Sequence, residues 1–128
     1  MRGMESRERL ASKAVLDVVR GEKPWRELRD YGIGIRLVGS DVKVLADAVA
    51  PVKATAADTA RGWLRLSGDA SALREWARVL HGAVSIVELD FNADPESDNL
   101  LDALWRVAFG ERITEEMNNT ARKVLMKK

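Results

Sequence analysis

"GDASALREWARVLHGAVSIVELDFNADPESDNLLDALWRVAFG", residues Gly68–Gly110, is the stretch that decides the fold class. Its first part places apolar residues at helical spacing behind a capping residue, either Asp69 or Ser71. Residues 84–91 then alternate apolar with polar side chains, which is typical of a half-buried strand. Residues 98–110 return to helical spacing. A helix, a strand and a second helix in succession predict a protein that mixes both kinds of structure.

The sequence on both sides of this stretch carries further helix patterns and one clear strand pattern. Residues 33–38 alternate apolar side chains with Gly34 and Arg36, which predicts a strand. Three other segments have apolar residues at helical spacing, with capping or stop residues at their ends. These helices are expected at residues 6–21, capped by Ser6 and stopped at Gly21; at residues 23–32, with Pro24 near the first position; and at residues 114–128, capped by Thr114.

Two segments fit more than one structure. Asp41–Ala50 has apolar residues at helical spacing and we favour a helix, although residues 38–41 could also turn a hairpin into a strand. Residues 51–68 favour a hairpin or two strands, with the turn at residues 56–59. Together the patterns predict one α+β domain over residues 1–128, helical at both chain ends. A mixed or antiparallel sheet of about three to five strands is expected, with helices packed on it.

The composition is that of a folded protein with few means of catalysis. Apolar residues make up 46% of the chain and charged residues 32%, a balance typical of a globular protein rather than a disordered one. The chain has no cysteine, which removes disulfides, thiolate nucleophiles and cysteine metal sites. Its single histidine, His81, has no second histidine with which to form a metal cluster. We expect no cofactor, and catalysis is the less favoured kind of function.

The sequence also predicts where the protein works. Residues 1–20 carry charges throughout and have no continuous apolar core, so they do not resemble a secretory signal peptide. The longest apolar run is shorter than the roughly 20 residues that span a bilayer. We therefore expect a soluble cytoplasmic protein without a membrane partner.

Charge is distributed unevenly although the net charge is only +1. Residues 1–36 hold nine basic and six acidic side chains, and residues 103–128 hold six basic and three acidic ones. Residues 87–102 hold six acidic side chains and no basic one. A nearly neutral but polarised chain argues against strong general affinity for nucleic acid and favours local electrostatic recognition.

The acidic segment resembles the first part of a calcium-binding loop, because polar residues occupy every second position from Asp90 to Asp98. In such a loop, counted from Asp90, the sixth position needs glycine and the twelfth needs a bidentate glutamate. Here these positions hold Pro95 and Leu101, which excludes the standard loop. Asp94 followed by Pro95 instead indicates the start of a helix, with Ser97 as an alternative cap one turn later.

A docking surface for a protein partner, or for a second copy of the chain, is the functional interpretation that we favour for the acidic segment. Six clustered carboxylates repel one another, and a basic partner would relieve this repulsion. The function expected is therefore that of a small, non-catalytic protein-interaction or regulatory module. The residues predicted to bind the partner are Glu88, Asp90, Asp94, Glu96, Asp98 and Asp102.

Two other functions are consistent with parts of the sequence. The first is nucleic-acid binding through a basic N-terminal helix and tail, using Arg7, Arg9, Lys13, Arg20, Arg122, Lys123, Lys127 and Lys128. These residues are accompanied by acids or lack an aromatic platform, so a solvated helix face explains them better. The second is an enzyme with a loose Mg²⁺ site formed by Glu88, Asp90, Asp94 and Asp98, but no glycine-rich phosphate loop accompanies these acids.

The histidine and the tryptophans have structural interpretations. His81 falls in the last turn of a predicted helix, where it can bond the terminal carbonyls and interact with the helix dipole. Trp76 and Trp105 fall on apolar helix faces and are expected in the core. Trp25 and Trp63 are less constrained, so that one of them could be an exposed anchor for a partner, although the core is favoured for both.

Overall fold

The computed structural model describes residues 2–39, 41–46, 51–91 and 94–126. Among these residues the helices and strands confirm an α+β fold that is helical at both ends. In chain order the elements are α1 (Arg2–Val19), the 3-10 helix η1 (Trp25–Tyr31), β1 (Ile33–Val38), β2 (Asp41–Ala46), β3 (Val52–Ala54), α2 (Ala56–Leu66), α3 (Ala70–Gly82), β4 (Val87–Leu89), α4 (Pro95–Ala108) and α5 (Glu115–Met126). None of the described helices has both the length and the apolar character needed to cross a membrane.

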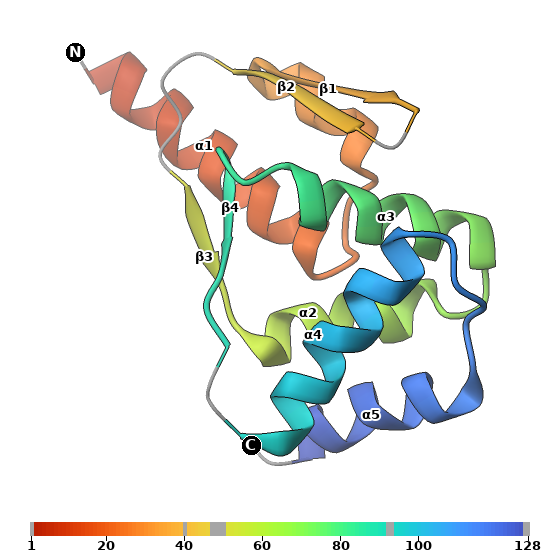
Figure 1. Ribbon diagram of the computed structural model, residues 1–128. Helices are drawn as coiled ribbons and strands as arrows, with labels where there is room; N and C mark the ends of the chain where they lie inside the picture. Colours follow the sequence, from red (N-terminus) through yellow and green to blue (C-terminus); the bar gives the residue numbers. More distant parts are fainter. Residues whose placement is uncertain (1, 40, 47–50, 92–93, 127–128) are drawn as a thin grey trace.

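The four described strands form two separate pairs rather than one sheet (Figure 1). β1 and β2 form an antiparallel hairpin that lies against α3, on the side away from α5. β3 and β4 run parallel and lie beside α1. The connection between β3 and β4 contains α2 and α3, and a crossover of this kind is what a parallel pair requires.

The core lies where the helices meet. α4 packs on both α3 and α5, and α5 also packs on α2. Two tryptophans stand at the centre: Trp63 of α2 is completely buried and Trp76 of α3 is 2% exposed. Their rings meet edge to face with centroids 6.4 Å apart. The Trp76 Nε1 donates to the Val18 carbonyl oxygen at 3.0 Å, which joins α3 to the end of α1.

The favoured helix at Asp41–Ala50 is wrong for its first part, because residues 41–46 form β2. β2 pairs in register with β1, from Val38 opposite Asp41 to Ile33 opposite Ala46. Gly39 has a φ of 57°, a left-handed value that glycine adopts without strain and that suits a tight hairpin turn. The hairpin alternative is therefore the correct one for these residues, and residues 47–50 lie outside the described part.

The hairpin or strand pair predicted for residues 51–68 is also wrong. Only Val52–Ala54 forms a strand, and the expected turn is the first turn of α2. Thr55 and Asp58 start this helix as a reciprocal capping box. The Asp58 N–H donates to the Thr55 Oγ1 at 3.1 Å, and the Thr55 N–H donates to the Asp58 Oδ2 at 3.2 Å.

The other predicted helices and strands are present. Asp69 caps α3 by accepting from the Ala72 N–H, and Thr114 caps α5 by accepting from the Met117 N–H. The short helix before Gly32 is a 3-10 helix, and α1 begins at Arg2, so that Ser6 lies inside the helix and is not its cap. These caps explain why most helix boundaries can be recognised from the sequence.

Asp58 also forms a partly buried ion pair with Arg20, the residue after α1. The Arg20 Nε lies 2.9 Å from the Asp58 Oδ1, and the Asp58 side chain is only 12% exposed. Burial alone raises the pKa of Asp58, but the hydrogen bond from Arg20 and those from Thr55 outweigh this effect and lower the pKa below its usual 3.8. Asp58 is therefore charged in the folded protein at neutral pH and stabilises the contact between α1 and α2.

Replacing this carboxylate should change how stability depends on pH. We expect Asp58→Asn to reduce the free energy of unfolding at pH 7 by about 2 kcal/mol. Because the folded pKa is lowered, the contribution of Asp58 is present above its unfolded pKa and is lost as pH falls through the folded pKa. Denaturant titrations across this acid range should show a steeper loss of stability for the wild type than for Asp58→Asn. The exposed Glu8→Gln provides the control, and parallel curves for wild type and Asp58→Asn would contradict the prediction.

Candidate protein-docking site

The predicted partner-binding residues lie on β4, on α4 and between them. Glu88 is exposed on β4, and Asp90 is exposed directly after this strand. Asp98 and Asp102 are exposed on α4, where the Asp102 Oδ2 lies 3.5 Å from the Arg106 Nη1. Four of the six predicted carboxylates are therefore accessible to a partner.

The other two predicted residues are only half-buried and have interactions within the protein. Asp94 caps α4, because its Oδ1 accepts from the Ser97 N–H at 2.9 Å and its Oδ2 accepts from the Ser97 hydroxyl at 3.0 Å. Pro95 is the first residue of the helix, so the predicted helix start is confirmed. Glu96 lies in the same first turn and is also engaged within the chain. Asp94 therefore stabilises α4, whatever else this segment does.

The metal-binding interpretation finds no arrangement to support it in the described part of the chain. There, no group of three or more histidine, aspartate or glutamate side chains is placed to hold a metal ion. Asn92, one residue of the calcium-loop pattern, lies outside the described part.

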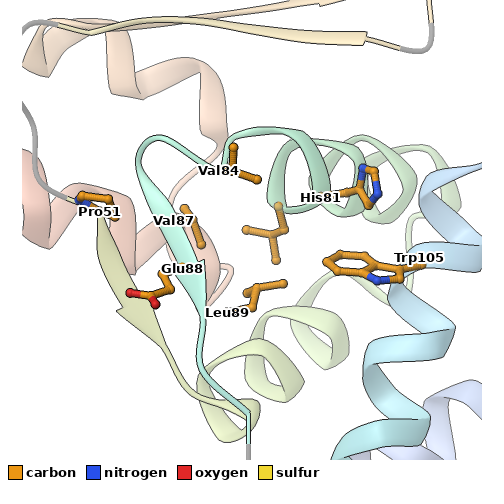
Figure 2. A pocket seen from close by; sticks show the side chains of 8 residues that line it. Pro51, His81, Val84, Val87, Glu88, Leu89 and Trp105 are labelled. Atoms are coloured by element: carbon orange, nitrogen blue, oxygen red, sulfur yellow. The ribbon is translucent and has the colours of Figure 1, made fainter.

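An apolar pocket of about 550 Å³ lies between β4 and the two helices α3 and α4 (Figure 2). This volume is typical of pockets that accept a small molecule or a few side chains. β3 lies on one side of β4 in this view, and His81 and Trp105 lie on the other. Most of the lining is apolar, and the complete set is Pro51, Leu80, His81, Val84, Val87, Glu88, Leu89 and Trp105.

His81 forms part of the wall of this pocket together with two aromatic rings. Its ring stands edge to face with those of Trp105 and Phe109, with centroids 4.7 Å apart in each case. His81 does lie in the last turn of α3, as the sequence predicted. Within the described residues, the interactions found for its side chain are these two ring contacts, and not a hydrogen bond to a terminal carbonyl.

Two exposed apolar side chains extend the apolar surface around the pocket. Val84, in the turn between α3 and β4, is 72% exposed and lines the pocket directly. Phe109, at the end of α4, is 67% exposed and reaches the pocket through its contact with His81. Large apolar side chains left in water beside an apolar hollow are typical of a surface that another molecule covers.

Exposed carboxylates lie on both of the elements that border the pocket, β4 and α4. Glu88 belongs to its lining on the strand side. On the helix side, Asp98 precedes Trp105 by seven residues, which places it two turns away on the same face of α4. Asp102 precedes Trp105 by three residues, but it lines a separate hollow between α4 and α5, beside its ion-pair partner Arg106. The pocket therefore has an apolar centre with Glu88 in its wall, and further carboxylates stand nearby in the chain on β4 and α4. We call Glu88, Asp90, Asp98 and Asp102 the acidic flanks below.

A second hollow, of about 540 Å³, lies between η1 and β1. Its charged lining residues alternate in sign, because Arg26 and Arg29 stand beside Glu27 and Asp30. Opposite charges at such short spacing largely cancel, so this hollow lacks the excess of negative charge that residues 87–102 carry.

The basic residues proposed for nucleic-acid binding are partly engaged with acids of the protein itself. The Lys13 Nζ lies 3.2 Å from Asp17, and Arg20 pairs with the interior Asp58. In α5, the Arg122 Nη1 lies 2.8 Å from Glu115. Lys127, Lys128 and the Arg7 side chain lie outside the described part.

The tryptophans divide into core and surface residues differently from the sequence prediction. Trp63 is completely buried, so it is not an exposed anchor, and Trp76 is in the core as predicted. Trp105 was expected in the core but is half-buried in the wall of the pocket. Trp25 is half-buried, and its Nε1 donates to Glu75 at 3.2 Å.

Sequence reasoning found the acids but missed the pocket between them. The lining comes from the start of β3, the end of α3, the following turn, β4 and α4. These segments are separated by up to 54 positions, from Pro51 to Trp105, and no local pattern relates them. The one usable signal was the concentration of carboxylates, which marks the rim and not the hollow.

Comparisons with known proteins give no further information on this site: no family model, no curated protein and no solved structure matches the chain.

Proposed function

We propose that this protein is a non-catalytic module that binds a protein partner through the β4–α4 pocket and its acidic flanks. The observation that supports the proposal most directly is the combination of an apolar pocket with exposed carboxylates on the strand and the helix that border it. Protein interfaces commonly have such an apolar centre with a polar rim. Aromatic residues at the centre contribute most of the binding free energy, and Trp105 is placed to do so here.

The sign of the charge favours a different protein over a second copy of this chain. A symmetric dimer through this surface would bring the same carboxylates of both copies face to face. Like charges opposed in this way disfavour association, whereas a basic surface is attracted and steered to the site. The partner that fits is therefore a protein with lysine or arginine side chains around an apolar protrusion.

Charge reversal on the acidic flanks tests the proposal. The test variant is Glu88→Lys, Asp98→Lys and Asp102→Lys combined, which leaves Asp94 unchanged because Asp94 caps α4. Glu8→Lys, Glu27→Lys and Asp41→Lys combined give the matched control, since these exposed acids lie elsewhere and the net charge changes equally. Each tagged protein is incubated with lysate of the source cell, and the retained proteins are quantified by mass spectrometry.

We expect a protein that the wild type and the control retain equally and that the test variant loses by about tenfold or more. The test variant loses the partner because its lysine side chains repel the basic surface of the partner. The partner's apolar protrusion then does not reach the pocket. If all three baits retain the same proteins, or if none of them retains a protein above the bare resin, the proposal is wrong. Circular dichroism of the three proteins should coincide, which confirms that the test variant is folded.

A further inference from the structure

β4 has a backbone edge that is only partly used within the described part of the chain. In the β3–β4 pair, the Val52 N–H donates to the Ile86 carbonyl oxygen at 2.8 Å, and the Asp90 N–H donates to the Ala54 carbonyl oxygen at 2.9 Å. Backbone groups of a strand alternate between its two edges, so the N–H and C=O of residues 87 and 89 point away from β3. The Val87 N–H donates to the Ala83 carbonyl oxygen, but among the described residues no hydrogen bond uses the Leu89 N–H.

This free edge borders the pocket. Three consecutive residues of β4, Val87–Leu89, line the hollow, and the opposite wall is formed by His81 and Trp105. Figure 2 shows these two side chains on the side of β4 that lies away from β3. A strand added to the free edge would lie about 4.8 Å from β4, and its alternate side chains would point toward the pocket. The Leu89 N–H would then gain an acceptor.

We propose, on the basis of the function proposed above, that the partner is bound as an extended segment that pairs with the free edge of β4. Addition of a peptide strand to an exposed sheet edge is a general mode of recognition, in which backbone hydrogen bonds give affinity and side-chain pockets give specificity. Apolar side chains of the segment occupy the pocket, and lysine or arginine side chains between them meet the acidic flanks.

Charge complementarity determines the composition of this segment. Glu88 and Asp90 lie along the strand and Asp98 lies on the facing helix, and none of the three forms an ion pair among the described residues. Lys53 stands opposite Glu88 in the β3–β4 register, yet these two residues form no ion pair either. A segment that alternates apolar and basic residues would therefore bind, and an acidic counterpart of the same pattern would be repelled.

The length of β4 limits the strength of the interaction. The strand has three residues, so few backbone groups are available at its free edge. Short, charged edges of this kind also prevent uncontrolled pairing between copies of a protein. We therefore expect a reversible complex, in which the backbone bonds and the pocket contact are both needed for measurable affinity.

The experiment uses a synthetic peptide of about eight residues in which valine and lysine alternate. Two derivatives carry N-methyl groups on backbone nitrogens. One is methylated at the backbone nitrogens of its valines, and the other at the backbone nitrogens of its lysines. These derivatives keep every side chain and charge but each removes the N–H groups from one edge of the peptide. A fourth peptide has glutamate in place of lysine. Binding is followed by the amide resonances of the full-length protein, with hydrogen exchange at the Leu89 N–H as the specific readout.

We expect the parent peptide to bind and to slow exchange of the Leu89 amide by about tenfold or more at saturation. One N-methylated peptide should bind like the parent and the other should bind about tenfold more weakly, because only one edge of the peptide faces β4. The glutamate peptide should not bind. The Glu88→Lys, Asp98→Lys and Asp102→Lys variant should lose the parent peptide as well.

Each other outcome overturns the inferred strand pairing and identifies which part of the inference fails. Equal affinity for both N-methylated peptides would show that the segment is held by side chains alone, and the proposed function would stand. Protection of the Leu89 amide without peptide, together with a dimeric mass in solution, would show that a second copy occupies the edge. Absence of peptide binding overturns the extended basic segment as the partner, while the lysate comparison decides the proposed function separately.

Discussion

Gly62→Ala should reduce the free energy of unfolding by about 3 kcal/mol or more, at the upper end of the cost of over-packing a core. Gly62 is buried in the middle of α2, where it meets the end of α1 and the side of α3. An added Cβ would overlap the Val19 carbonyl oxygen and would lie 2.6 Å from the Trp76 Cζ2. The opposite sign would be expected for an unhindered helix position, where alanine is favoured over glycine by about 1 kcal/mol.

The two groups that oppose this Cβ cannot easily move apart. The Val19 oxygen belongs to the backbone at the end of α1, and the Trp76 ring is held there by its hydrogen bond to the Val18 oxygen. Relief would require α1 and α3 to shift together away from α2. The expected destabilisation therefore comes from disturbing the contact between three helices and not from moving one side chain.

Denaturant titration followed by circular dichroism measures this effect, and Gly68→Ala provides the control. Gly68 lies in the turn between α2 and α3, and a Cβ added there would meet no atom within 4 Å. Its replacement should change stability by no more than about 0.5 kcal/mol. Equal stability of Gly62→Ala and Gly68→Ala would mean that α1 and α3 do not approach α2 at Gly62.

Local sequence patterns were sufficient wherever a helix has a capping residue and an apolar face of its own. Asp69, Asp94 and Thr114 each accept from a backbone N–H of the first turn that follows. Each was recognised from the sequence, Asp69 and Asp94 as one of two alternatives. Thr55 and Asp58 form the same kind of cap, but they lie in a segment whose alternation also fits strands. The capping box of Thr55 and Asp58 was the sequence signal for a helix in this segment, and the structure follows this signal rather than the strand-like alternation.

β2 depends on contacts that no local pattern contains. Its side chains Val42 and Val44 are half-buried, and Val42 lies against Gly82 at the end of α3, so close that a Cβ at Gly82 would stand 2.5 Å from the Val42 Cβ. This packing partner is 40 positions away in the chain, whereas the helical spacing of residues 42–49 is visible locally. The candidate site has the same limit: the exposed acids can be recognised from composition, but the pocket exists only after α3, β4 and α4 have packed.

Trp63→Ala should reduce the free energy of unfolding by about 3–5 kcal/mol, the usual range for removing a large aromatic side chain from a core. Trp63 is completely buried and contacts Trp76 edge to face. Its Nε1 also donates to the Asn118 Oδ1 at 2.8 Å, so the same side chain joins α2 to α5. The substitution therefore leaves a cavity at the centre of the helices and removes the donor from a half-buried amide.

Two further variants separate these contributions in the same denaturant titrations. Trp63→Phe keeps an aromatic ring but loses the hydrogen bond to Asn118, and it should cost about 1–2 kcal/mol; it also provides a measurement if Trp63→Ala does not fold. Trp25→Ala removes the half-buried tryptophan at the start of η1, whose ring is covered by Arg26 and whose Nε1 reaches Glu75, and it should cost about 1 kcal/mol. If Trp63→Ala were no more destabilising than the about 1 kcal/mol expected of Trp25→Ala, Trp63 would not occupy the centre of the core. The exposed anchor that sequence reasoning allowed for one of these two residues would then have to be sought at Trp63 again.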